Sequence, residues 1–222
     1  MCGRFALSAK TGEIENLLPE KKIAGNVVPR YNIAPSQQIA AIINSKPNEI
    51  TQVRWGLIPF WAKNAAIGNS LINARAETLH EKSSFKMPIR KKRCLIPASG
   101  FYEWKAIAGE KRKIPHFIRM KSSDCFTFAG LWDSWKDSEN NTIITATIIT
   151  TVPNELMAAI HNRMPVIIPR EQRHLWLSNH EDINEISKLL KPYPSEEMTV
   201  YPVSFRVNSP ALDDMKCMMA DE

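Results

Sequence analysis

Residues 94–151 read CLIPASGFYEWKAIAGEKRKIPHFIRMKSSDCFTFAGLWDSWKDSENNTIITATIITT and contain most of the strands that the sequence predicts. It consists of apolar, aromatic and β-branched runs separated by short polar segments, which is the pattern of strands joined by turns. The runs predict strands over Cys94–Pro97, Phe101–Lys105, Pro115–Met120, Phe126–Trp132 and Thr142–Thr151. Their hairpin-like spacing favours antiparallel pairing.

The rest of the chain adds strands and a set of mostly late helices. Further predicted strands are Ile39–Ile43, Ile50–Trp55, which follows a Pro47-Asn48 turn, and Met198–Val203. The predicted helices are Glu13–Leu18 (capped by Thr11 and ended by Pro19), Asn73–Leu79 (one or two turns), Pro153 to about Ile160, Pro169–Leu177 and Asp182–Leu190. This order predicts an α+β fold, a single domain over residues 1–222 with a mainly antiparallel β-sheet or barrel-like core and peripheral helices.

Composition excludes several classes of protein. Of 222 residues, 44% are hydrophobic and 23% charged, unlike a disordered chain, a collagen or a coiled coil. No uncharged apolar run approaches the roughly 18–20 residues of a membrane span, and the N-terminus has no signal-peptide core. We therefore expect a protein of the cytoplasm, or of the nucleus in a eukaryote, without a membrane partner. We also expect a monomer. The net charge of +6 is compatible with nucleic-acid binding but does not establish it.

The cysteines and histidines predict neither a metal site nor a disulfide framework. The four cysteines contain no C-x-x-C pair, and the five histidines show no metal-ligand spacing, so we expect no cofactor. The basic runs Arg90–Arg93 and Lys111–Lys113 are expected to be solvated loops beside strands.

Cys2 offers chemistry that no internal cysteine has. If Met1 is removed, Cys2 carries a free α-amine beside its thiol. An α-amine has a pKa of about 7.7–8.0, against about 10.4 for lysine, so a useful fraction can attack an aldehyde near neutral pH. The thiol could then close the imine into a five-membered thiazolidine ring. Two other interpretations stay open: an N-terminal-nucleophile amidohydrolase, which would use the amine as base, and a small terminal residue without a role.

Glu103 is a carboxylate inside the aromatic segment Gly100–Trp104. Strand alternation puts it on the face of Phe101, with Tyr102 and Trp104 on the other face. Apolar surroundings would favour the protonated carboxyl, which could donate and recover a proton near pH 7. The alternative is a glutamate on an exposed sheet face.

Two further segments pair a neutral polar side chain with an arginine. His161 and Arg163 follow a predicted helix and suit proton transfer and phosphate contact, although the histidine alone could serve only the helix C-terminus. Asn73 and Arg75 place an amide and a guanidinium near a predicted helix start, where Asn73 could serve only as a cap.

Aromatic rings gather in the segment WGLIPFW at residues 55–61. The rings of Trp55, Phe60 and Trp61 could stack on unpaired bases, or they could pack on the core.

Taken together, these segments resemble the SOS-response-associated peptidase (SRAP) family. The matching motifs are MCGRF at 1–5, YNIAPSQ at 31–37, WGLIP at 55–59, NARAET at 73–78, CLIPASGFYEW at 94–104, FAGLW at 128–132 and HNRMPV at 161–166. They occur in the family's order and span residues 2 to about 210.

The resemblance implies a sensor and shield of abasic sites in single-stranded DNA, acting in the response to DNA damage. Such proteins form a covalent DNA–protein crosslink through the N-terminal cysteine, which agrees with the aldehyde that a ring-opened abasic sugar carries at C1′. The imine makes a lyase activity and crosslink reversal conceivable. The family name also records a proposed peptidase activity; because Cys2 directly follows Met1, methionine removal exposes it without self-cleavage.

The resemblance also implies roles for individual residues. Cys2 would be the nucleophile, Asn73 would position its amine and thiol, Glu103 would be the acid and base, and His161 would assist proton transfer. The implied DNA contacts are Arg4, Arg75 and Arg163 on phosphates, and Trp55, Phe60, Trp61 and Trp104 as stacking or wedging rings.

Two alternative functions stay open. A cysteine-dependent peptidase or amidohydrolase would need an oxyanion site and an acyl intermediate. A non-covalent reader of single-stranded or modified DNA would keep its affinity without the Cys2 thiol and would bind with steep salt dependence. In either DNA-binding interpretation, the protein would associate with the nucleoid when bound.

Overall fold

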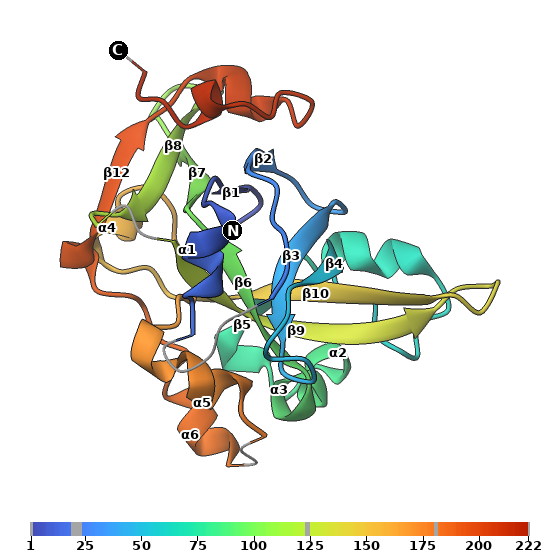
Figure 1. The fold of residues 1–222 in the computed structure, drawn as a ribbon. Coiled ribbons are helices and arrows are strands. Elements are labelled where there is room, and N and C mark those ends of the chain that lie inside the picture. The colour runs from blue at the N-terminus through green and yellow to red at the C-terminus, as the bar shows by residue number, and fades with distance from the viewer. Residues whose placement is uncertain (1, 19–23, 123–124, 180–181, 222) are drawn as a thin grey trace.

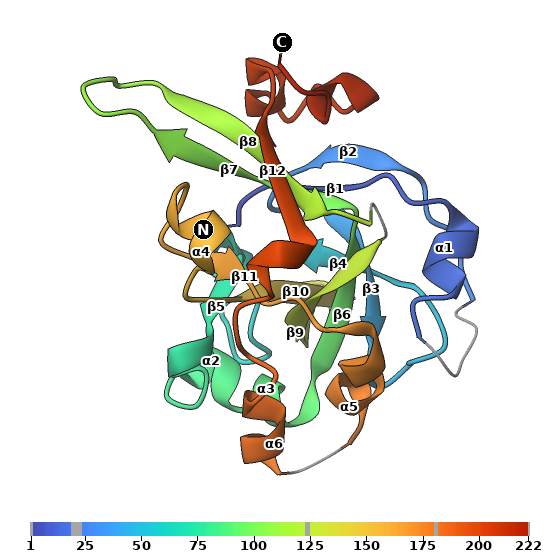
Figure 2. The same cartoon turned by 90° about the vertical axis from the view of Figure 1, so that its left-hand side faces the viewer.

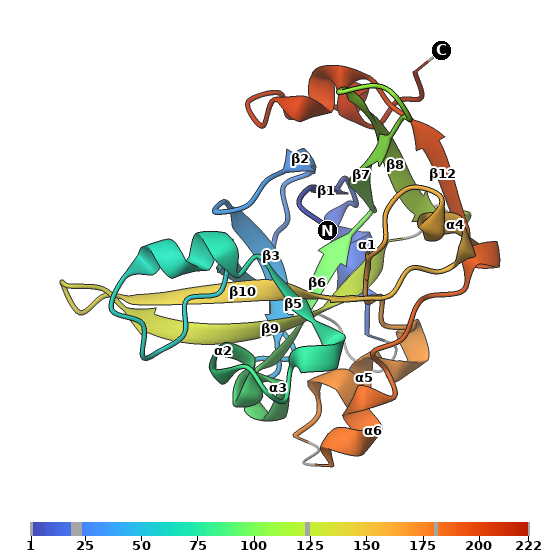
Figure 3. The same ribbon diagram turned by 180° about the vertical axis from the view of Figure 1, so that it is seen from behind.

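The computed structural model describes residues 2–18, 24–122, 125–179 and 182–221, and Figures 1, 2 and 3 show it from three sides. Met1 and Pro19, which carried parts of the sequence predictions, lie outside the described residues. The strands are β1 (Phe5–Leu7), β2 (Arg30–Ile33), β3 (Gln38–Ile43), β4 (Thr51–Trp55), β5 (Asn73–Arg75), β6 (Arg93–Ala98), β7 (Gly100–Ala106), β8 (Lys113–Met120), β9 (Phe126–Lys136), β10 (Thr142–Thr151), β11 (Met164–Pro165) and β12 (Met198–Pro202).

The helices are short. The α-helices are α1 (Thr11–Glu15), α2 (Ser83–Lys86), α3 (Pro88–Lys91), α4 (Glu155–Ala158), α5 (Arg173–Leu177) and α6 (Ile183–Ser187). The 3₁₀ helices are η1 (Ala65–Ser70), η2 (Ala76–Thr78), η3 (Arg170–Gln172), η4 (Ser195–Glu197), η5 (Phe205–Asn208) and η6 (Met215–Cys217). The predicted α+β fold is therefore confirmed, and each of the eight predicted strands is present within a few residues of its expected bounds.

Five strands close a barrel-like core. Hydrogen bonds join β10, β4, β3, β6 and β9 in that order, and β9 pairs back with β10. The β10–β4 pairing is parallel and the others are antiparallel. A second, fully antiparallel sheet runs in the order β12-β8-β7-β1-β2 beside the barrel (Figure 1).

Edge-to-face aromatic contacts connect the sheet to the barrel. The Phe5 ring on β1 lies 5.2 Å from Trp55 on β4 and 5.7 Å from Phe128 on β9, measured between ring centroids. Trp55 is fully buried, and its Nε1 donates to the carbonyl oxygen of Ile72 at 2.9 Å. The expectation that Trp55 stacks on DNA bases is therefore wrong, because its ring is part of the core.

Strand pairing explains the main error in the helix predictions. Asn73, Ala74 and Arg75 form β5, which pairs in parallel with Ile148–Thr150 of β10, and only the short η2 follows. The hydrogen bonds offered by β10 outweigh a weak local helix preference, so Asn73 is a strand residue and not a cap.

Helix starts differ from prediction by small amounts. Thr11 is the first residue of α1 rather than its cap, and the helix ends at Glu15. The helix predicted from Pro153 begins at Glu155, because the Asn154 side chain caps it by accepting from the Met157 N–H at 2.9 Å. The helix predicted over Asp182–Leu190 is the shorter α6, and the Asp182 side chain caps it by accepting from the Asn184 N–H at 2.9 Å.

The basic run at 90–93 is not a solvated loop throughout. Arg93 is fully buried, and its guanidinium donates to carbonyl oxygens that include those of Ile89 and Trp176. Carbonyls near helix C-termini carry partial negative charge and suit a cation. Lys92 forms an ion pair with the buried carboxylate of Asp133 at 2.6 Å.

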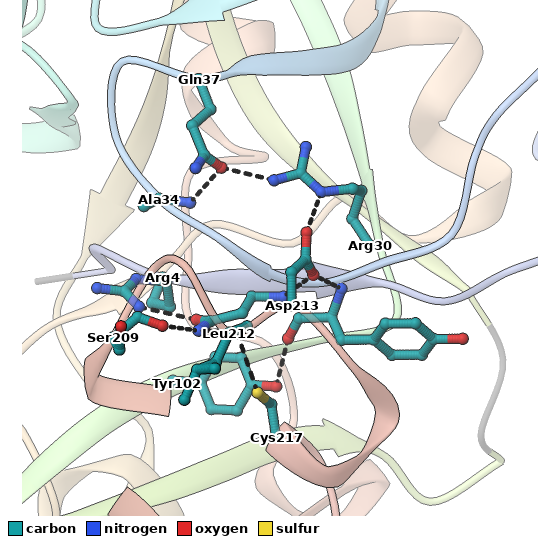
Figure 4. A network of polar contacts seen from close by, with 11 residues as sticks. Arg4, Arg30, Ala34, Gln37, Tyr102, Ser209, Leu212, Asp213 and Cys217 are labelled. Carbon is teal, nitrogen blue, oxygen red and sulfur yellow. Dashed lines mark hydrogen bonds and ion pairs between the residues drawn. The ribbon is translucent and has the colours of Figure 1, made fainter. Parts of the chain in front are cut away.

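The C-terminal segment covers the β2 edge of the sheet (Figure 4). The Asp213 carboxylate accepts from the backbone N–H groups of Tyr31 and Asn32 and from the Arg30 guanidinium. In return, the Asn32 side-chain amide donates to the Leu212 carbonyl at 2.7 Å. These contacts satisfy polar groups that an edge strand would otherwise leave unpaired.

Candidate functional site

Sheet pairing brings the N-terminal segment against β7. Phe5 pairs with Phe101, and the Tyr102 N–H donates to the Arg4 carbonyl at 2.9 Å. Continued by two residues, this antiparallel register brings Gly3 level with Glu103. Cys2 is fully buried and Glu103 is 3% exposed, so the predicted nucleophile and the predicted acid and base occupy one enclosed region.

The Cys2 thiol is held in its protonated form. Burial raises the pKa of Cys2 well above the ordinary thiol value, the nearby charge of Glu103 raises it further, and a hydrogen bond from the Arg4 backbone N–H acts in the opposite direction. A nucleophilic step at Cys2 sulfur therefore needs a group that removes the thiol proton.

Asn73 holds the backbone at Cys2. Its side-chain Nδ2 donates to the Cys2 carbonyl oxygen at 2.8 Å, and β10 fixes the Asn73 backbone through its pairing with Ile148. The Oδ1 atom of the same amide is buried and has no hydrogen-bond partner in the described part of the chain. One acceptor thus remains available beside the start of the chain.

A tight turn after α4 fixes His161. The His161 N–H donates to the Met157 carbonyl at 2.8 Å, and the Arg163 N–H donates to His161 Nδ1 at 3.1 Å. Because Nδ1 accepts, this geometry assigns the proton of the neutral ring to Nε2. The turn therefore leaves Nε2 as the nitrogen that can donate.

The end of β10 gathers the other polar groups. Thr150 pairs with Arg75 of β5 on one side and with Pro165 of β11 on the other. Arg163 donates to the Thr150 carbonyl at 2.7 Å and forms a bidentate ion pair with Glu77 at 2.7 and 2.9 Å. Arg75 is exposed, whereas Arg163 is largely occupied by protein groups.

The Glu77–Arg163 pair has a predictable effect on stability. Arg163 holds the pKa of Glu77 below its ordinary value, so the pair stabilises the fold above that ordinary value and the stabilisation is lost as the pH falls through the lower, folded-state pKa. Because the Glu77 side chain is 47% exposed, we expect Glu77→Gln to lower the free energy of unfolding by at most about 1 kcal/mol at pH 7.

Urea unfolding at pH 7 and in acid below the glutamate reference pKa of about 4.3 checks this expectation. Glu49→Gln is the matched control, since the Glu49 side chain is 48% exposed but its partner Lys46 is 59% exposed, against 13% for Arg163. An equal loss for both variants at pH 7, or a Glu77→Gln loss that does not shrink in acid, would contradict it.

Arg4 and Trp104 have internal partners. The Arg4 guanidinium donates to Asn32 Oδ1 at 2.8 Å and to the Val207 carbonyl at 2.6 Å, and Trp104 Nε1 donates to Asn208 Oδ1 at 2.8 Å. Arg4 is half-buried and its Nη1 anchors the C-terminal segment, and its role as a phosphate contact stays a prediction. Trp104 is half-buried, with Arg4 5.9 Å from its ring centroid.

Phe60 and Trp61 are exposed rings on a fixed backbone. Their exposed fractions are 64% and 47%. The Phe60 N–H donates to Asp133 Oδ2 at 3.0 Å, and Trp135 Nε1 donates to the Ala62 carbonyl at 2.6 Å. Asp133 and Glu77 carry no sequence pattern that marks them as site residues, although Glu77 lies inside the NARAET motif.

Neither a metal cluster nor a membrane helix is found within the described ranges. No group of three or more His, Cys, Asp and Glu side chains there could hold a metal ion. No described helix is long and apolar enough to cross a membrane.

Comparison with known proteins gives consistent similarities. The family model described as SOS response associated peptidase (SRAP) matches residues 1–210. The abasic site processing protein YoqW of Bacillus subtilis strain 168 is 50% identical over 218 residues, 95% of each chain. The abasic site processing protein HMCES of Gallus gallus is 30% identical over 267 residues, covering 100% of this chain and 78% of its own.

Solved structures agree with the sequence comparison. A crystal structure of a protein from Bacteroides thetaiotaomicron superposes with a TM-score of 0.88 at 31% identity over 100% of both chains. A phage-related protein from Bordetella bronchiseptica gives a TM-score of 0.71 at 27% identity, covering 91% of this chain and 94% of its own. The chain therefore belongs to the SOS response associated peptidase (SRAP) family.

Proposed function

We propose that this protein processes abasic sites by capturing them covalently in single-stranded DNA, through a thiazolidine formed by Cys2 after Met1 is removed. The printed names of its relatives support abasic-site DNA as the substrate. The observation that supports this chemistry is the environment of the buried Cys2. Asn73 donates a hydrogen bond to its carbonyl oxygen, and the nearby charge of Glu103 raises the pKa of its thiol. The protein would act as a single-domain monomer on DNA in the cytoplasm, without a cofactor.

The proposed reaction has two bond-forming steps. The Cys2 amine attacks the C1′ aldehyde of the ring-opened sugar, and loss of water gives an imine. The Cys2 sulfur then bonds to the imine carbon, and its proton is transferred to the imine nitrogen. The product ring contains N, Cα, Cβ, S and C1′. Holding both reacting groups on one residue supplies the high effective concentration of an intramolecular closure.

Asn73 and Glu103 suit the two halves of this reaction. The buried Oδ1 of Asn73 would accept a hydrogen bond from the new Cys2 amine while Nδ2 keeps the Cys2 carbonyl in place. Glu103 would take the proton of a thiol that burial keeps protonated and return it to the developing amine. The carboxyl would also protonate the sugar oxygen during ring opening.

The polar end of β10 would bind the DNA backbone. Arg75 is exposed and would contact a phosphate directly. Arg163 would contact a phosphate by giving up its ion pair with the Glu77 carboxylate. His161 would assist proton transfer through Nε2. Phe60 and Trp61 would stack on unpaired bases from a backbone that is already ordered, with a smaller contribution from half-buried Trp104.

The alternative functions are less well supported. A cysteine hydrolase normally has a thiol pKa lowered by nearby positive charge, whereas burial and Glu103 raise that of Cys2. A purely non-covalent reader would not need a buried N-terminal thiol. Lyase activity by β-elimination from the imine would be a side reaction of the same intermediate.

A blocked N-terminus tests the proposal directly. Inserting a lysine between Met1 and Cys2 prevents methionine removal and leaves Cys2 internal, so we expect no complex that survives denaturing electrophoresis with abasic single-stranded DNA. Intact mass spectrometry verifies both N-termini, and non-covalent affinity for undamaged DNA should be retained. If the variant with the inserted lysine crosslinks as fast as the protein with a free N-terminal Cys2, the proposal is wrong.

A further inference from the structure

A cavity lies outside the site described above. It encloses about 780 Å³ and is lined by residues from α1, the start of β9, α5 and the segment before β12. None of the residues to which a role in abasic-site capture was given lines it. Cavities of this size hold small ligands or the end of a peptide.

A buried arginine that makes no direct ion pair with a described residue lines this cavity. Arg173 is 6% exposed; its Nη1 donates to the Leu17 carbonyl at 2.8 Å and its Nε to the Ile168 carbonyl at 3.3 Å. It forms no ion pair with any described carboxylate, and although burial lowers the pKa of Arg173 to about 10, the side chain stays charged at neutral pH. Buried charges are normally paired.

Arg93 is a buried arginine of the same fold whose guanidinium is bound by more protein carbonyls. Its guanidinium donates to four carbonyl oxygens, those of Ile89, Arg90, Trp176 and Ser178. Arg173 has two such bonds, which leaves guanidinium N–H groups unassigned in the wall of a cavity. An anion in the cavity would therefore find donors on Arg173 that no protein carbonyl occupies.

The neighbouring groups define which anion fits. Gln172 Oε1 is a buried acceptor without a hydrogen-bond partner among the described residues, and it lines the same cavity. Leu17, Phe126 and Ile167 supply an apolar wall. A ligand that satisfies all three features carries a carboxylate, an adjacent N–H donor and an apolar side chain.

The charged groups that line the cavity disfavour polyanions. Three glutamates, Glu13, Glu171 and Glu197, line the cavity against the cations Arg170, Arg173 and Lys191. Equal numbers of positive and negative groups suit a single carboxylate better than a polyanion such as a nucleotide or a DNA backbone, which would bring several negative charges close to the glutamates. We infer that the cavity binds the C-terminal residue of a peptide, with its carboxylate on Arg173, its amide N–H on Gln172 and its apolar side chain on the Leu17–Phe126 wall.

Isothermal titration calorimetry with the peptide acetyl-Ala-Ala-Leu tests this inference. We expect saturable binding of the free acid and at least tenfold weaker binding of the same peptide with a C-terminal amide. Arg173→Met should weaken binding of the acid at least tenfold, whereas Arg90→Met, which removes an exposed arginine outside the cavity, should leave it unchanged.

A second variant keeps the test decisive if Arg173→Met does not fold. Gln172→Glu retains an acceptor but places a negative charge beside the bound carboxylate, and it should also weaken binding of the acid. Equal affinity for acid and amide, no saturable binding at millimolar peptide, or unchanged affinity in Gln172→Glu would overturn the inference. Cys2→Ala should not alter peptide binding, so this outcome is independent of the abasic-site proposal.

Discussion

Cys2→Ala is expected to abolish the DNA–protein complex that survives denaturing electrophoresis, at any protein concentration and after long incubation. The variant keeps the α-amine, so it can form an imine, but it has no sulfur to close the ring, and the imine hydrolyses on denaturation. The loss should be complete because no other residue can supply both reacting groups. Borohydride should trap the imine of Cys2→Ala, which separates the first bond-forming step from the second.

Two cysteine variants give this prediction its controls. Cys125→Ala removes a partly buried thiol elsewhere in the fold and should leave crosslinking unchanged, which excludes general thiol reactivity. Cys2→Ser should form a less durable oxygen ring and release captured DNA more readily. A denaturation-stable complex in Cys2→Ala would show that the covalent bond forms elsewhere on the chain.

The same alanine variant measures the non-covalent step. With ring closure removed, its affinity for single-stranded DNA reports the phosphate and stacking contacts alone. That affinity should fall steeply with salt if Arg75 and Arg163 contact phosphates. Affinity that is retained but indifferent to salt would instead favour the exposed rings of Phe60 and Trp61 as the main contact.

The sequence indicated the strands well, because their patterns are local. Thr142–Thr151 is a β-branched run with polar turn residues before it, and it forms β10 as predicted. Barrel closure was not predictable in the same way, since it depends on β9 and β4 both pairing with β10 across the fold. Asn73 is an example, because its strand conformation comes from pairing with β10 and not from its neighbours in sequence.

Candidate site residues could be named from sequence, but their exposure could not. Trp55 and Trp61 lie in one short aromatic segment, yet Trp55 is fully buried against Phe5 and Trp61 is 47% exposed. Arg4 lies beside the reactive terminus in sequence, but its Nη1 donates to Asn32 and Val207 because the C-terminal segment folds back onto it. Such long-range partners leave no periodic signal in the sequence.

Glu103→Gln is expected to slow crosslink formation by about 10²- to 10⁴-fold, the usual contribution of a positioned general acid and base. Glutamine has nearly the same shape, so β7 should keep its pairing with β8, where Glu103 lies opposite His116. It cannot, however, take the proton from the buried Cys2 thiol. By microscopic reversibility, release of DNA from the finished thiazolidine should slow as well.

Single-turnover crosslinking over a range of pH measures this effect, and the Kd for undamaged single-stranded DNA shows whether binding is intact. Glu110→Gln is the matched control, because it makes the same substitution at an exposed position beyond β7 on the same hairpin. If Glu103 only packs, the variant loses stability while the rate of the folded fraction stays at the wild-type value. If Glu103 transfers protons, the crosslinking rate falls while the Kd and the free energy of unfolding stay unchanged. The carboxylate is then required for the chemistry and not for folding.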